Sequence, residues 1–115
     1  MEMVDTLLIV PLLSGAIFIL AGFIMLVFPP MKINGLYGYR TGSSMKSQDR
    51  WDFAQKYSAK ELMRSGVVLI LTSALGFVIE PTDDVATIIG LGLMIAMVIV
   101  LFIRVEKAIK DRFSE

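Results

Sequence analysis

The chain has 115 residues, of which 56% are hydrophobic and 19% are charged. This is more apolar surface than a soluble domain of this size can bury, so residues 1–115 are predicted to form a single membrane domain. The sequence has no Cys, no His and zero formal net charge, which argues against thiolate or imidazole catalysis, metal sites built on those ligands and charge-driven binding of nucleic acid.

Three uncharged apolar runs predict an all-α integral membrane protein with three transmembrane helices, spanning about residues 6–28, 62–79 and 85–103. About 20 apolar residues cross the hydrocarbon core, so the first and third runs are long enough. The second run is short, because it lies between Arg64 and Glu80. Leu62 and Met63 extend it, and the Arg64 side chain can reach the membrane surface.

The basic residues predict the orientation of these helices, because cytoplasmic loops collect Lys and Arg. All eleven basic residues lie between the first two spans, at the start of the second span (Arg64) or after the third span. The segments before the first span and between the second and third spans carry acidic charges only. We therefore expect the N-terminus outside, with the segment 29–61 and the tail 104–115 in the cytoplasm.

The segment after the first span predicts turns followed by a long helix. Pro29 and Pro30 end the first helix, and several glycines follow. Ser44 or Ser47 is a suitable N-cap for a helix that we expect from about 47 to 79. Its first half is amphipathic and cytoplasmic, and the second span continues it. Its helical spacing puts five residues on one face: Trp51, Ala54, Ser58, Leu62 and Ser65. Lys56, Lys60 and Arg64 fall on another face.

The third span is preceded by a turn over 81–84, where Thr82 or Asp83 is expected to cap the helix. The tail after Arg104 is predicted to continue that helix into solvent. Within the span, Gly92 and Ala96 have a spacing that permits close approach of another helix, including one from a second copy of the chain. The alternative is that glycine is simply common in membrane helices.

The connector between the first two spans holds more hydrogen-bonding side chains than a simple link needs. Arg40 offers five donors in a planar fork, and Asn34 and Thr41 can fix turns. The residues could form a folded cap over the cytoplasmic ends of the helices. Alternatively, the aromatic residues form an interfacial belt and Arg40 only sets orientation. Glu61 is expected at a depth similar to that of Arg40, so one hypothesis is an ion pair between these two residues. The alternative is that Glu61 is solvated.

These residues resemble the motif of the SdpI family of bacterial membrane proteins. The match comprises Pro30, Asn34, Gly38, Tyr39, Arg40, Thr41, Ser44 and Trp51. The resemblance is close over roughly 28–79, and the three predicted spans resemble small family members. It places the chain in the bacterial inner membrane as a multi-pass protein.

The resemblance implies that the chain gives immunity to, or signals the presence of, a membrane-active peptide toxin. A founding member of the family protects its host from such a peptide and holds a transcriptional repressor at the membrane. The implied partners are a peptide toxin, a cytoplasmic regulator, the lipid bilayer and a second copy of the chain. We expect no nucleic acid partner, no cofactor and no metal. The alternative is a small oligomeric transporter or channel subunit, or a structural membrane protein. The predicted spans carry no charged residue at mid-membrane, which disfavours proton-coupled transport, and no acid–base spacing predicts an enzyme.

Overall fold

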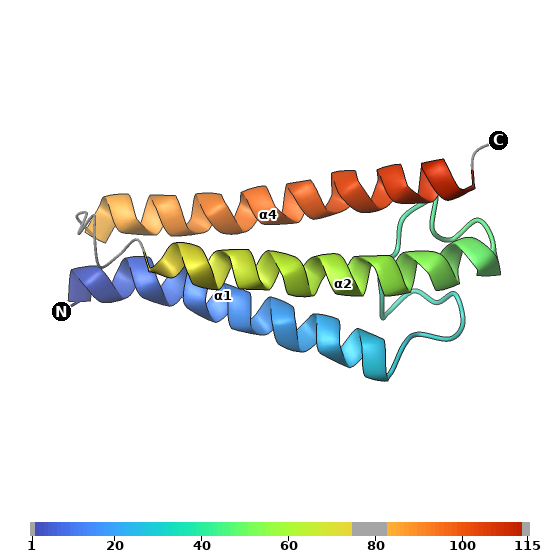
Figure 1. Cartoon of the computed structure of the whole chain (residues 1–115), viewed down its shortest axis with the longest axis horizontal. Helices are drawn as coiled ribbons and strands as arrows, with labels where there is room; N and C mark the ends of the chain where they lie inside the picture. The colour runs from blue at the N-terminus through green and yellow to red at the C-terminus, as the bar shows by residue number, and fades with distance from the viewer. Residues whose placement is uncertain (1, 75–82, 114–115) are drawn as a thin grey trace.

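The computed structural model describes residues 2–74 and 83–113, and these residues form three helices. α1 covers Glu2–Val27, α2 covers Gln48–Ser73 and α4 covers Asp83–Arg112. Figure 1 shows the helices side by side in an elongated bundle, with the start of α1 and the end of α4 at opposite ends. The all-α class predicted from the sequence is confirmed.

Two of the helices have the length and apolarity of membrane spans. Ile9–Val27 in α1 and Asp84–Arg112 in α4 are both long and apolar enough to cross a bilayer. Their outer surfaces carry large apolar side chains, such as Ile17 at 61% and Ile103 at 62% exposure. Water-soluble proteins rarely expose so much contiguous apolar surface, so a membrane environment fits these helices. The span predicted over 62–79 runs past the described part of α2 and stays a prediction.

α1 and α2 approach each other closely through glycines. A Cβ atom at Gly15 would lie 2.5 Å from the Gly66 carbonyl oxygen, and one at Gly66 would lie 2.5 Å from the Gly15 carbonyl oxygen. Further along, a Cβ at Gly22 would lie 2.6 Å from the carbonyl oxygen of Ala59. The two backbones are therefore in contact because these positions have no side chain.

α4 packs against α1, but not through Gly92 and Ala96, the two small residues expected to allow close approach. A Cβ at Gly90 would lie 2.9 Å from the Cβ of Val10, whereas no atom lies within 4 Å of one at Gly92. Ala96 is exposed as well. The expectation that Gly92 and Ala96 bring helices close together is therefore wrong within the chain, because both lie on the outer side of α4. Contact with a second copy stays a prediction.

α2 begins and packs as its sequence predicts. Ser47, rather than Ser44, is its N-cap, and the Ser47 hydroxyl accepts the backbone N–H of Arg50 at 3.1 Å. The predicted inner face is confirmed, since Trp51 and Ala54 are fully buried. The predicted basic face is exposed at Lys56, Lys60 and Arg64. Its continuation beyond Ala74 lies outside the described residues.

α4 continues well beyond its apolar stretch. It runs without interruption to Arg112, so the helix predicted after Arg104 is confirmed. The expectation that this tail is solvated is wrong on one face, because Val105 and Ile109 are fully buried in the core. The proposed turn before it falls mostly outside the described chain, as does the suggested cap at Thr82. The charged end of α4 and the connector between α1 and α2 lie at the same end of the bundle (Figure 1).

Candidate functional site

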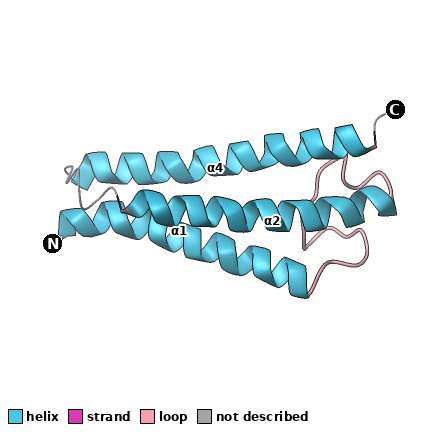
Figure 2. Cartoon of the chain, viewed as in Figure 1, coloured by secondary structure: helices cyan, strands magenta, loops and turns pink. Residues whose placement is uncertain are grey.

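The candidate site is the connector over residues 28–47, which Figure 2 shows as one continuous loop between α1 and α2. Asn34 closes its first turn. The Asn34 side-chain oxygen accepts the backbone N–H groups of Leu36 at 2.9 Å and Tyr37 at 2.8 Å, and its amide donates to the Lys32 carbonyl at 2.9 Å. This arrangement replaces backbone pairing with side-chain bonds, as Asn does in turns.

Two side chains on the first turns of α2 hold the beginning of the loop. The Trp51 indole N–H donates to the Pro30 carbonyl at 2.6 Å, and the Trp51 side chain is fully buried. Gln48 donates its side-chain amide to the Met31 carbonyl at 2.7 Å. Trp51 therefore works as a buried anchor with its polar atom satisfied, as expected for a buried indole.

Gly38 and Gln55 fix the middle of the loop. The Gln55 side chain accepts the backbone N–H of Tyr39 at 2.7 Å and donates to the Tyr39 carbonyl at 2.9 Å, so it pairs with the loop as a strand neighbour would. Gly38 has a φ of +109°, a conformation that L side chains rarely adopt. A Cβ there would lie 2.5 Å from the Gln55 side-chain oxygen. Glycine is required for both reasons.

Ser44 closes the second turn of the loop. Its buried hydroxyl accepts the backbone N–H of Thr41 at 2.9 Å and lies 3.1 Å from the carbonyls of Tyr39 and Thr41, to either of which it can donate. The Ser44 N–H in turn donates to the Thr41 hydroxyl at 3.2 Å. With the turn closed in this way, the Tyr39 and Thr41 side chains lie toward α4.

Glu106 of α4 receives these side chains. One carboxylate oxygen accepts the hydroxyls of Tyr39 at 2.6 Å and Thr41 at 2.8 Å, and the other accepts the Ser43 hydroxyl at 2.6 Å. The Tyr39 ring also packs on Phe102, with ring centroids 5.4 Å apart. Hydrogen bonds to a charged acceptor are stronger than those between neutral groups, so this carboxylate joins the loop to α4 firmly.

The environment shifts the pKa values of both partners. Burial, followed by the hydrogen bond to Glu106, raises the pKa of the Tyr39 phenol well above its usual value. Glu106 lies beyond the apolar stretch of α4. Its partial burial raises the pKa of the carboxyl, but the hydroxyls of Ser43, Tyr39 and Thr41 together lower it, and the net shift is downward. The network therefore holds a charged carboxylate and a neutral phenol.

A second carboxylate joins α2 to α4 beside this network. Glu61 is buried and forms a bidentate pair with Arg104, at 2.6 Å from its Nε and 3.3 Å from an Nη. Arg64 also contacts Glu61 at 3.0 Å. The hypothesis of an Arg40–Glu61 pair is therefore wrong: Glu61 is an ion-pair partner, but Arg104 faces it from the neighbouring helix.

Arg40 differs from the other motif residues. Its neighbours in the motif are engaged with the loop, α2 or α4, whereas the Arg40 side chain is exposed and pairs with no described residue. Of the two interpretations of this segment, the folded cap is the one that the geometry matches. The cap displays Arg40 on its surface.

Three contributors were missed from the sequence: Gln55, Arg104 and Glu106. Gln55 follows Trp51 by one helical turn on the inner face of α2, and that spacing could have identified it. Arg104 and Glu106 gave no local signal, because the tail of α4 reads as a solvated helix. In the described part of the chain, no three His, Cys, Asp or Glu side chains are grouped to hold a metal ion.

The chain is similar in sequence to the proteins of one known family. The sequence model of the SdpI/YfhL protein family matches residues 30–105, which include the whole loop from Pro30, α2 and the residues of α4 up to Val105. The chain belongs to the SdpI/YfhL family. The chain is also 36% identical, over 99 residues, to the uncharacterized protein YfhL of Bacillus subtilis (strain 168), with 86% of this chain and 84% of that protein covered. No solved structure matches the chain.

The residues of the loop from Pro30 onward lie within the region that matches the family. The resemblance inferred from Asn34, the Gly38–Thr41 stretch and Trp51 is confirmed, and these residues all lie within the matched region. SdpI/YfhL membership and the two apolar helices together support a membrane protein. Glu106 lies one residue past the match, although it binds three hydroxyls from within it.

Proposed function

We propose that this SdpI/YfhL-family protein protects the bacterial inner membrane against a membrane-active peptide toxin or signals the presence of such a peptide. Family membership supports the proposal. In it, the apolar helices meet the peptide in the bilayer, and the loop faces the cytoplasm, where a regulator docks. The distribution of basic residues supports that orientation, with the N-terminus outside and three spans.

The observation that carries the docking part is the contrast between Arg40 and its neighbours. Trp51 and Ser44 are fully buried, and Gly38 is fixed by its backbone, so these residues build the cap. Arg40 is exposed on that rigid support. A guanidinium held on a fixed turn is well suited to bidentate binding of a carboxylate or phosphate on a partner. We assign Arg40 the contact with an acidic group of the regulator.

A survival assay tests the proposal. A sensitive bacterium expresses the wild type, Arg40→Ala or Lys32→Ala, and a membrane-active killing peptide of the type associated with the family is added. Lys32→Ala is the matched control, since it removes an exposed cation from the same loop. Membrane abundance is measured by immunoblot, and membrane potential is followed alongside survival.

Protection by the wild type and by Lys32→Ala, with loss in Arg40→Ala at equal abundance, is the expected result. Equal protection by all three would keep immunity but reject a role for Arg40 in it. Absence of protection by abundant wild-type protein would reject immunity to that peptide. A pull-down of cytoplasmic proteins with the wild type and Arg40→Ala then decides whether the cap still binds a regulator.

A further inference from the structure

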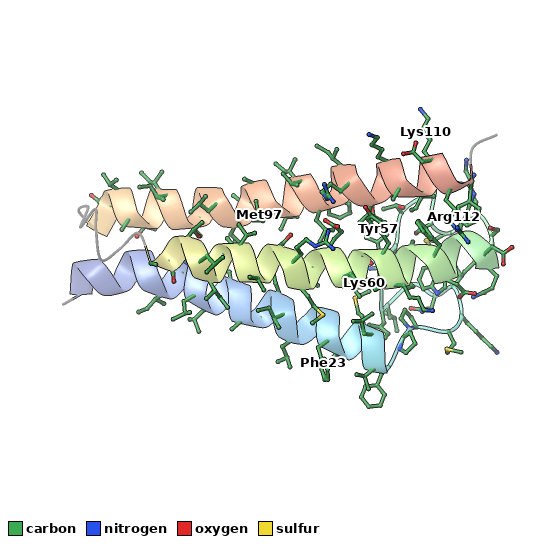
Figure 3. All side chains as sticks on the ribbon, in the orientation of Figure 1. Phe23, Tyr57, Lys60, Met97, Lys110 and Arg112 are labelled. Atoms are coloured by element: carbon green, nitrogen blue, oxygen red, sulfur yellow. The ribbon has the colours of Figure 1, made fainter. Side chains whose placement is uncertain are left out.

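A hollow of about 560 Å³ lies between the end of the loop and the charged part of α4. Ser43 and Glu106 line it together with an aromatic ring and three lysines. The ring is that of Phe113, the lysines are Lys46, Lys107 and Lys110, and Arg50 lines the hollow as well. Lys110 projects from the outer side of α4 in Figure 3. The hollow therefore has a polar wall and a basic rim.

The charges of this hollow are unbalanced. Lys46, Lys107 and Lys110 are exposed, and no described carboxylate pairs with any of them. Glu106 lines the same hollow, but its oxygens are already occupied by three hydroxyls. Arg50 adds a further positive charge while its guanidinium donates to the Phe113 carbonyl at 3.1 Å. Within residues 2–74 and 83–113, the three ammonium groups of the hollow thus have no carboxylate partner.

The depth of the hollow matches that of lipid headgroups. The uncharged stretch of α4 ends at Ile103, and Lys107 lies four residues further on. At about 1.5 Å per residue, the Lys107 backbone lies roughly 6 Å beyond that end. The polar layer on each side of the hydrocarbon core is about 5–8 Å thick. A phosphate in this layer would therefore sit level with Lys107. The Lys110 backbone lies roughly 10 Å beyond the same end, so Lys110 reaches this layer through its long side chain.

An apolar track leads from the hollow along α4. Ile103 and Ile99 precede Lys107 at four-residue intervals, so the three side chains follow one line on the helix surface. Ile103 is 62% and Ile99 is 53% exposed. An amphiphile whose anionic group contacts Lys107 can lay its hydrocarbon chain on these isoleucines. A soluble acidic peptide would leave this track unused.

A neighbouring groove between α2 and α4 is less suited to an anion. Two of its three cations are already engaged, since Arg104 binds Glu61 and Arg112 lies over the Phe53 ring at 5.3 Å from the centroid. The third is Lys107, which lines this groove as well as the hollow. Asp111 also lines it. Figure 3 shows Tyr57 and Arg112 on this side of α4, whereas Lys110 points away from α2.

We infer that the hollow between the loop and α4 binds the phosphate of an anionic phospholipid through Lys46, Lys107 and Lys110. The lipid would rest against the same elements that the Glu106 network joins. Its binding would hold the loop and α4 together from the membrane side. The inference requires α4 to be in a membrane, but it does not depend on immunity or on a regulator.

Lipid titration of the full chain in detergent tests this site. Native mass spectrometry counts retained lipid after addition of dioleoylphosphatidylglycerol, zwitterionic dioleoylphosphatidylcholine or inorganic phosphate. The triple variant Lys46→Gln/Lys107→Gln/Lys110→Gln removes the rim charges. The matched control is Lys32→Gln/Lys56→Gln/Lys60→Gln, which removes the same charge from exposed lysines away from the hollow. Thermal unfolding without lipid checks that both triples fold.

The expected result is that the wild type and the control retain phosphatidylglycerol in preference to phosphatidylcholine. The rim variant should lose affinity for it about tenfold or more, because each lysine near a lipid surface contributes substantially to attraction. Equal losses in both triples would overturn the inference in favour of diffuse charge attraction. Equal retention of the two lipids would overturn it too, and so would displacement of phosphatidylglycerol by inorganic phosphate at equal concentration.

Discussion

Tyr39 in the loop and Glu106 in α4 are joined by a hydrogen bond of 2.6 Å, although 67 positions separate them in the sequence. Thr41 and Ser43 share the same carboxylate. Gln55, from α2, holds the Tyr39 backbone on its other side. The loop is therefore held between two helices, and Glu106, together with the Phe102 ring, connects it to α4.

Replacing Glu106 with Gln should destabilise the protein by about 2 kcal/mol, because three hydroxyl donors lose a charged acceptor. An amide also brings its own donors, so the hydroxyl donors cannot all be satisfied. The free energy of unfolding in detergent is measured against Asp111→Asn, which changes an exposed carboxylate on the same helix. Equal stability of the two variants would contradict a structural role for the Glu106 network.

The stability contributed by Glu106 should depend on pH in a defined direction. The folded state lowers the pKa of this carboxyl, so its contribution is present above the ordinary carboxyl pKa. It should be lost as the pH falls through the lowered value in the folded state. The difference in unfolding free energy between wild type and Glu106→Gln should therefore be large near neutral pH and should shrink in acid. A difference that is constant from neutral to acidic pH would count against the assignment.

Gly38→Ala should be strongly destabilising, by about 2 kcal/mol or more, since the residue has a positive φ. The added carbon would also lie against the Gln55 oxygen and Pro30. Gly42→Ala is the matched control, because nothing lies within 4 Å of its Cβ position and its φ is not in the strained range. Thermal melting of the two variants in one detergent gives the comparison. Similar melting temperatures would show that the loop does not hold Gly38 in this conformation.

Local patterns in the sequence predicted much of the bundle. The helical spacing of Trp51, Ala54 and Ser58 identified the inner face of α2, and Ser47 is a suitable cap placed just before it. The motif residues were identified as a group because their types and spacing match a family. Such features depend on neighbours within a few turns, so they can be read without the tertiary fold.

Contacts between distant segments could not be predicted in the same way. Arg40 and Arg104 were both available to Glu61 at a similar depth, and only the facing direction of α4 decides between them. The sequence also does not show which glycines allow two helices to approach. Gly66 and Gly92 both lie in apolar stretches, yet one touches another helix and the other faces outward. The periodicity of a helix predicts which of its faces is buried, but it does not predict which other helix packs against that face.

That contrast between glycines gives a further prediction. Gly66→Ala should force α1 and α2 apart, because the added carbon would lie 2.5 Å from the Gly15 carbonyl oxygen. We expect a loss of about 1–3 kcal/mol, the range found when a packed interior is overfilled. Gly92→Ala, which adds the same group to open space, should leave the melting temperature nearly unchanged. A large effect at Gly92 would instead indicate that this face packs against a second copy, which crosslinking would then test.

The proposed orientation can be tested cleanly because the chain has no native cysteine. Single variants Glu2→Cys, Lys46→Cys, Asp84→Cys and Asp111→Cys are treated in intact cells with a membrane-impermeant maleimide. Positions 2 and 84 should react from outside, whereas 46 and 111 should react only after lysis, because the basic segments remain in the cytoplasm. Each protein is also labelled after lysis to confirm that its thiol is reactive.

The pattern at positions 46 and 84 decides whether α2 spans the membrane. α2 joins the loop to the segment before α4, so a spanning α2 must leave these two positions on opposite sides. Reaction of both from the same side would mean that α2 does not cross, and the three-span topology would be rejected. In that case α1 and α4 would be the spanning helices, and the close packing of Gly66 in α2 against Gly15 in α1 would be rejected as well.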